Sequence, residues 1–154
     1  MLTEILAALQ GSALAAALRG STWLYPLVNA GHIAGIALLF GAIAVLDLRL
    51  LGAWRATPLP LLSRIVTPVA ASGFALAAVA GSLLFIVKAK DYAGSTLFQA
   101  KMVLVALALA NVLAFFTLQR RARPAPAALL PLSGAASLTL WLAVLVLGRL
   151  VGYF

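Results

Sequence analysis

The sequence predicts an all-α integral membrane protein: one transmembrane domain over residues 1–154, folded as an antiparallel four-helix bundle with an amphipathic interfacial helix at the N-terminal end. Two observations carry this prediction. First, 65% of the 154 residues are hydrophobic and only 9% are charged, against roughly 25% charged residues in an average soluble domain. Second, four long uncharged intervals separate the charges, at 20–46, 65–87, 102–119 and 124–148. Each is near or above the ~20 residues that an α-helix needs to cross a bilayer.

Composition also excludes classes of function. The net charge is +8, but the basic residues lie in short connections rather than on one patch, which suits lipid headgroups and not nucleic acid. The chain has no cysteine, so a disulfide, a thiolate metal site and a cysteine nucleophile are excluded. Phosphate-binding, zinc-protease and serine-hydrolase motifs are absent from the sequence. Asp47 and Asp91 are expected in connections on opposite faces of the membrane, which argues against paired-carboxylate catalysis.

The helices are predicted in chain order. Over residues 1–18 an apolar stripe opposes a weaker polar side, and the lack of a basic leading segment favours an interfacial helix over a cleaved signal peptide. The stripe consists of Leu2, Ile5, Leu6 and Leu9. The four spans are predicted at residues 23–46, 65–87, 97–118 and 131–151. Lys101 is included in the third span because its flexible stem can carry the ammonium toward the interface.

Short connections bound the spans and predict antiparallel neighbours. Pro58 and Pro60 deny a continuous helix after the first span, and Pro68 is expected in the first turn of the second, where its missing N–H matters least. The last connection holds Arg120, Arg121 and Arg123, followed by Pro124, Pro126 and Pro131. The first and third connections carry six arginines against four or five basic residues on the opposite face. This bias predicts that both termini lie on the non-cytoplasmic side.

Ionisable residues inside apolar spans are the leading candidates for a functional site, because their burial in lipid is costly. His32 lies nine residues past Trp23, which is ~13 Å at 1.5 Å per residue, near the midplane. Lys101 lies only ~6 Å past Leu97 by the same rise. Tyr25 and Asn29 precede His32 at helical spacing and form a polar ladder with it. Alternation of the spans places these residues toward one leaflet, together with Lys88, Arg149 and Tyr153.

Several interpretations of these residues stay open. His32 is a neutral imidazole bonded to a backbone carbonyl or a polar side chain, a ligand of a metal or haem, or part of a proton relay. Lys101 either reaches the headgroups or serves as counter-ion for an anionic ligand, and Arg149 is an interface anchor in the simplest view. Trp141, deep in the fourth span, is expected to pack in the core or to line a ligand pocket.

Haem b is the cofactor that uses most of these residues together. Its iron takes an imidazole as axial ligand, which His32 would supply, and its propionates would pair with Lys101 and Arg149. The chain has one histidine, so coordination would be five-coordinate, completed by Met102, or shared across a dimer. Asn29 and Tyr25 complete the predicted haem-binding set.

Residues 29–41, running Asn-Ala-Gly-His-Ile-Ala-Gly-Ile-Ala-Leu-Leu-Phe-Gly, and residues 101–111, running Lys-Met-Val-Leu-Val-Ala-Leu-Ala-Leu-Ala-Asn, carry a resemblance. The chain resembles small bacterial four-span membrane proteins that include uncharacterised domain families and the copper-resistance D-type domain. It is more distantly similar to the haem-containing membrane protoporphyrinogen oxidase. The resemblance implies a bacterial inner-membrane location, His32 as haem ligand and Lys101 as the matching basic residue.

Three functional hypotheses follow. The first is a tetrapyrrole or related redox ligand at His32, with electron transfer to a membrane redox partner. The second is a non-catalytic membrane subunit or scaffold in which His32 is structural, and the third is a transporter of a metal or small solute. Small residues that could pair bundles predict a homo-oligomer; they are Gly31, Gly35, Ala42, Gly73 and Gly81.

Overall fold

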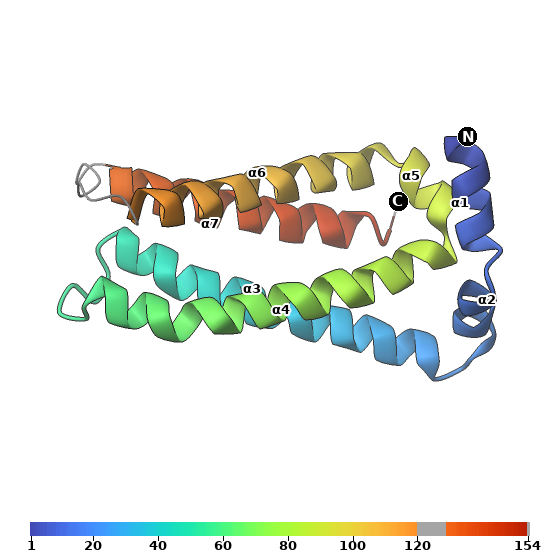
Figure 1. Cartoon of the computed structure of the whole chain (residues 1–154), viewed down its shortest axis with the longest axis horizontal. Helices are drawn as coiled ribbons and strands as arrows, with labels where there is room; N and C mark the ends of the chain where they lie inside the picture. The colour runs from blue at the N-terminus through green and yellow to red at the C-terminus, as the bar shows by residue number, and fades with distance from the viewer. Residues whose placement is uncertain (120–128, 154) are drawn as a thin grey trace.

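A computed structural model describes residues 1–119 and 129–153, and within them the chain is entirely helical (Figure 1). The helices are α1 (Leu2–Gln10), α2 (Ala13–Gly20), α3 (Leu24–Leu50), α4 (Leu59–Val87), α5 (Ala89–Gly94), α6 (Thr96–Gln119) and α7 (Leu129–Leu150). The four long helices α3, α4, α6 and α7 are apolar and long enough to cross a membrane. The predicted all-α, four-helix membrane bundle is therefore confirmed.

The long helices differ from the predicted spans mainly at two ends. The first span continues past Asp47 to Leu50, so the prediction that Asp47 lies in a connection is wrong. The second begins at Leu59, with Pro58 as its N-cap residue and Pro60 in its first turn, the helical position that tolerates proline best. Pro68 consequently lies inside α4 and not in its first turn, which corrects the expectation from the sequence.

Two of the predicted connections between spans differ in what the structure describes of them. The last connection, with Arg120, Arg121, Arg123, Pro124 and Pro126, lies outside the described residues. Pro131, which was predicted in this connection, lies instead in the first turn of α7. The connection between the second and third spans contains a short helix that the sequence did not suggest, α5.

The N-terminal segment lies across one end of the bundle, beside α5 (Figure 1). It forms two helices rather than one over residues 1–18, because Ser12 starts a new helix by accepting a hydrogen bond from the Ala15 N–H at 3.2 Å. Arg19 Nη1 donates to the carbonyl oxygen of Val87 at 3.1 Å, at the end of α4. The Lys90 N–H donates to Gln10 Oε1 at 3.2 Å. The segment is thus fastened to the α4–α5 junction.

The bundle consists of two helix pairs, α3 with α4 and α6 with α7, joined through contacts between α3 and α7. Among the described residues, no Cα atoms of α4 and α6 come within 8 Å of each other. The tightest crossing is between α3 and α4, where Gly35 and Gly73 face each other and leave no room for side chains. Gly31, by contrast, faces open space. The loose side of the bundle, between α4 and α6, is where the main cavity lies.

Candidate functional site

His32 lies between α3 and α4 and is half-buried. Its Nδ1 is 2.8 Å from the carbonyl oxygen of Ala77 on α4. Because a carbonyl can only accept, the proton is assigned to Nδ1, and the lone pair remains on Nε2. The ring packs against Gly81, where an added Cβ would lie 2.9 Å from His32 Cε1. The imidazole therefore bridges the two helices and has a fixed orientation.

Lys101 lies near the start of α6, on a different helix from His32. Its ammonium is close enough for its charge to act on the imidazole. The side chain is half-buried and runs along α7, where a Cβ added at Gly148 would lie 3.4 Å from Nζ. No ion pair of Lys101 is formed with any residue that the structure describes.

The other predicted site residues do not gather around His32. Asn29 and Met102 are exposed on the surface of the bundle. Tyr25 is also exposed and lies near Tyr92 of α5. Arg149 donates a hydrogen bond to the Tyr153 hydroxyl and stacks over its ring, with Cζ 4.5 Å from the centroid. No hydrogen bond among the described residues joins any of these four residues to the imidazole.

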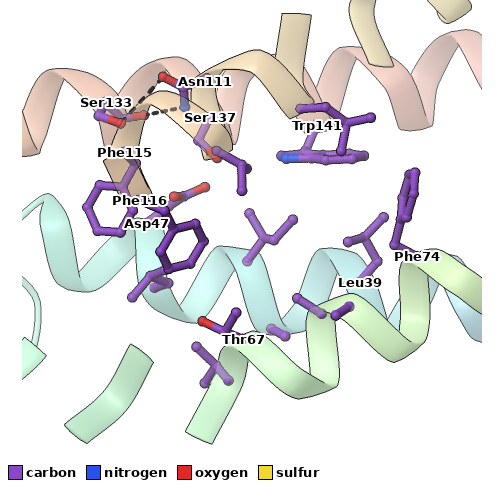
Figure 2. A pocket seen from close by; sticks show the side chains of 18 of the residues that line it. Leu39, Asp47, Thr67, Phe74, Asn111, Phe115, Phe116, Ser133, Ser137 and Trp141 are labelled. Atoms are coloured by element: carbon purple, nitrogen blue, oxygen red, sulfur yellow. Dashed lines mark hydrogen bonds between the residues drawn. The ribbon is translucent and has the colours of Figure 1, made fainter. Parts of the chain in front are cut away.

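A cavity of about 320 Å³ lies between the two helix pairs, in the half of the bundle away from the N-terminal segment (Figure 2). Its walls come from α3, α4, α6 and α7 and are mostly aliphatic and aromatic, with Leu39, Phe74 and Phe115 among them. Such a volume is at the lower end of the range for small-molecule sites. We call it the Asp47–Trp141 cavity.

Two buried polar atoms in this cavity have no hydrogen-bond partner among the described residues: Asp47 Oδ2 and Trp141 Nε1. Both side chains are almost completely buried, at 3% and 4% exposure. Figure 2 shows the indole nitrogen on the edge of the ring that points toward Asp47. Buried polar groups in proteins nearly always have partners, and an orphan costs roughly 1–3 kcal/mol. An acceptor and a donor without a partner among the described residues thus belong to two side chains that line the same apolar cavity.

Neighbouring polar residues do not neutralise Asp47. Arg49, two residues further along, donates instead to the carbonyl oxygens of Thr57 at 2.8 Å and Arg55 at 3.3 Å. The Ser137 hydroxyl lies within hydrogen-bonding reach of the carboxyl group (Figure 2) but carries no charge. Gly134 lets α7 approach α3 closely, because an added Cβ would lie 3.0 Å from the Asp47 carbonyl oxygen. This close approach fixes the carboxyl group at the cavity wall.

A second polar pair closes the cavity wall between α6 and α7. Asn111 Nδ2 donates to the Ser133 carbonyl oxygen at 3.2 Å, and the Ser133 hydroxyl donates to Asn111 Oδ1 at 3.4 Å (Figure 2). Asn111 and Ser133 thus supply hydrogen-bond partners to each other, whereas Asp47 Oδ2 and Trp141 Nε1 have none among the described residues. Asp47 Oδ2 and Trp141 Nε1 are therefore the two buried side-chain atoms of the described lining that have no partner.

The mouth of the cavity faces the lipid between α4 and α6. Ala71 of α4 and Leu113 of α6 both line the cavity and are exposed on the outer surface. Both residues lie well inside helices that are long enough to span the membrane. A molecule dissolved in the bilayer could thus reach the cavity sideways, without passing through water.

Sequence reasoning identified His32 but missed Asp47. The missed signal was that leucines continue beyond Asp47 at positions 48, 50 and 51 without a proline or glycine before Gly52, so the apolar helix continues through the charge. Trp141 was predicted to pack in the core or to line a pocket, and the structure shows both. No group of three or more His, Asp or Glu side chains that could hold a metal ion occurs in the described part of the chain.

A scan against protein-family models matches none of them, and searches of curated proteins and of solved structures find no match to the chain. Function must therefore be argued from the residues of the two regions themselves.

Proposed function

We propose that this integral membrane protein binds a small, largely apolar molecule in the Asp47–Trp141 cavity. The observation that carries the proposal is the pair of orphan atoms, Asp47 Oδ2 and Trp141 Nε1, in one cavity. A carboxyl group in an apolar span is costly, and leaving one of its oxygens and a buried indole N–H without partners among the described residues adds to that cost. A ligand that pairs with both atoms would recover this free energy on binding.

The sequence suggested a transporter of a metal or small solute as its third hypothesis, and binding of a small molecule does not itself require transport. The proposal is supported by the mouth of the cavity at Ala71 and Leu113, which gives access from the bilayer. The volume of about 320 Å³ equals roughly ten water volumes, which suits a compact ring or a short chain. Apolar walls would supply affinity, and the two polar atoms would supply orientation.

Photolabelling tests whether the cavity is accessible. Purified protein in lipid nanodiscs is irradiated with a small apolar diazirine, 3-trifluoromethyl-3-phenyldiazirine, and the labelled residues are mapped by mass spectrometry. We expect labelling at Phe116 and Trp141, which line the cavity, above that of the exposed residue Val103 of α6. The variant Ala71→Phe should suppress labelling of the cavity residues by filling its mouth.

The matched control is Ala75→Phe on the same helix, because Ala75 is exposed but is not part of the cavity lining. It should leave the labelling pattern unchanged. Equal labelling of cavity and lipid-facing residues, unaffected by Ala71→Phe, would contradict the proposal.

Haem b ligation by His32 is the second candidate function. It is supported by the hydrogen bond from Nδ1 to the Ala77 carbonyl oxygen, since a ligating imidazole typically donates its other N–H to such an acceptor. The charge of Lys101 on the same side suits a propionate. The fit is partial, because Met102 is exposed, Arg149 is bonded to Tyr153, and the chain offers one imidazole. If bound, haem would supply one-electron chemistry with a membrane redox partner.

Spectroscopy separates this candidate from a structural histidine. Protein expressed with ample haem should show a Soret band that His32→Ala abolishes and Lys101→Ala weakens. A colourless protein that gives no spectral change on added haem leaves His32 as a purely structural bridge between α3 and α4. Homo-oligomerisation and the orientation of the termini stay predictions, and multi-angle light scattering of the solubilised protein tests the first.

A further inference from the structure

We propose that the ligand of the Asp47–Trp141 cavity is a neutral, hydroxyl-bearing lipophilic molecule that enters sideways from the bilayer between α4 and α6. This inference rests on the proposed function and specifies the chemical class of the ligand. It follows from the polar atoms that the cavity offers, those that it lacks, and the position of its mouth.

Anionic ligands do not match the cavity. Among the described residues, Asp47 is the only ionisable side chain in the lining, which includes no lysine, arginine or histidine of that part of the chain. The nearest arginine in sequence, Arg49, is held by the loop carbonyl oxygens of Thr57 and Arg55. A carboxylate or phosphate ligand would therefore lose its hydration next to a carboxyl group, without a compensating cation among the described lining residues.

Cationic ligands match only half of the polar groups. A protonated amine could donate to Asp47 Oδ2, but it has no lone pair for the Trp141 indole N–H. The indole N–H is a donor only, and it has no acceptor among the described residues. An amine would therefore leave one of the two orphan atoms unpaired.

A hydroxyl group offers both the donor and the acceptor that these two atoms lack. It can donate its proton to Asp47 Oδ2 and can accept from Trp141 Nε1, or from the carboxyl group when Asp47 is protonated. The surrounding residues Leu39, Phe74, Phe115 and Phe116 form an apolar wall around this polar end (Figure 2). The matching molecule thus has a hydroxyl head and an aromatic or branched apolar body.

The route follows from the mouth. Ala71 and Leu113 are exposed on a surface that faces lipid, so the ligand reaches the cavity from the hydrocarbon region. A neutral hydroxylated lipophile partitions there readily, whereas a charged molecule stays near the headgroups. Chemical class and access route therefore agree.

A four-membered probe series tests the inference. The probes are 4-butylphenol, its methyl ether 4-butylanisole, the protonated amine 4-butylbenzylamine and the anion 4-butylbenzoate. The full chain is used in nanodiscs with Trp23→Phe and Trp54→Phe, which leaves Trp141 as the only tryptophan of the three in the sequence. Binding is followed by Trp141 fluorescence, with probe concentrations corrected for partitioning into protein-free nanodiscs.

We expect the phenol to bind about tenfold or more tightly than the ether, because the ether cannot donate to Asp47. In the matched variant Asp47→Leu the phenol and the ether should bind equally. A cooperative thermal unfolding transition verifies that this variant folds. If it does not fold, the probe series on the protein that retains Asp47 still tests whether the phenol binds more tightly than the ether.

Tighter or equal binding of the ether, amine or benzoate would overturn the neutral-hydroxyl inference while leaving the cavity as a binding site. If none of the four probes changes Trp141 fluorescence or the melting temperature, the proposed function itself fails.

Discussion

Gly35 of α3 and Gly73 of α4 face each other so closely that a Cβ atom added to either would lie 2.5 Å from a backbone nitrogen of the opposite helix. Real Cβ atoms do not approach backbone so closely, so any larger residue must push the helices apart. This contact holds together the helix pair that carries both His32 and Asp47.

We therefore predict that Gly35→Ala lowers the free energy of unfolding by about 1–3 kcal/mol, the usual cost of overpacking. Gly31→Ala, one turn earlier, is the control because its added Cβ meets nothing within 4 Å. It should be neutral or stabilise by up to about 1 kcal/mol through helix propensity. SDS titration followed by circular dichroism measures both, and equal effects would refute the role of the crossing.

Asp47→Leu should raise the stability of the ligand-free protein. The substitution removes a buried carboxyl oxygen that has no partner among the described residues, so the gain should be about 1–3 kcal/mol. The control is Asp91→Asn, which also removes a carboxylate but on an exposed position of α5, and should change little. A strong loss of stability in Asp47→Leu would show that Asp47 is a structural residue.

The contact between His32 and Gly81 predicts a coupling between two substitutions. Gly81→Ala should destabilise the protein by about 1–3 kcal/mol, because the new Cβ would meet the imidazole at 2.9 Å. In a His32→Ala background the same substitution should be neutral, since the ring is gone. A double-mutant cycle by SDS denaturation gives the coupling energy. An identical cost in both backgrounds would disprove the packing.

Arg19 should fasten the N-terminal helices to the bundle through its hydrogen bond to the Val87 carbonyl oxygen. Arg19→Gln should loosen α1 and α2, with faster hydrogen exchange in both and a loss of about 1–2 kcal/mol in local stability. Arg64→Gln is the matched control, because Arg64 is exposed on α4, far along the chain from this contact. Unchanged exchange in Arg19→Gln would rule out this fastening.

Tyr92 predicts an alkaline limit to stability. Burial raises the pKa of its hydroxyl, and the neighbouring Tyr25 and Asp91 raise this pKa further. The unfolded chain then loses the proton first as pH passes about 10, so the free energy of unfolding should fall above that pH. Tyr92→Phe should flatten this fall. The absorbance of tyrosinate at alkaline pH reports the ionisation of tyrosine. Denaturation curves at each pH give the free energy of unfolding of the unsubstituted protein and of Tyr92→Phe.

The sequence by itself determined the membrane architecture. Long uncharged intervals leave a chain no alternative in lipid to helices that satisfy their own backbone, and the four spans appear within a few residues of their predicted positions. His32 was found for the same reason, since an imidazole in the middle of such a span is conspicuous. The ends of α3 and α4 were missed, because a single aspartate or an early proline does not stop a helix that packing supports.

Only the tertiary structure decided which polar residues belong together. Helical spacing grouped Tyr25, Asn29 and His32 on one ladder, but packing against α4 buries the imidazole and leaves Asn29 exposed. Asp47 and Trp141 are 94 positions apart in the sequence, from 47 to 141, and face one cavity because Gly134 lets α7 approach α3. Such a pairing depends on the rotation of each helix about its axis. That rotation is set by contacts between helices, and the uniformly apolar faces of these spans do not encode it.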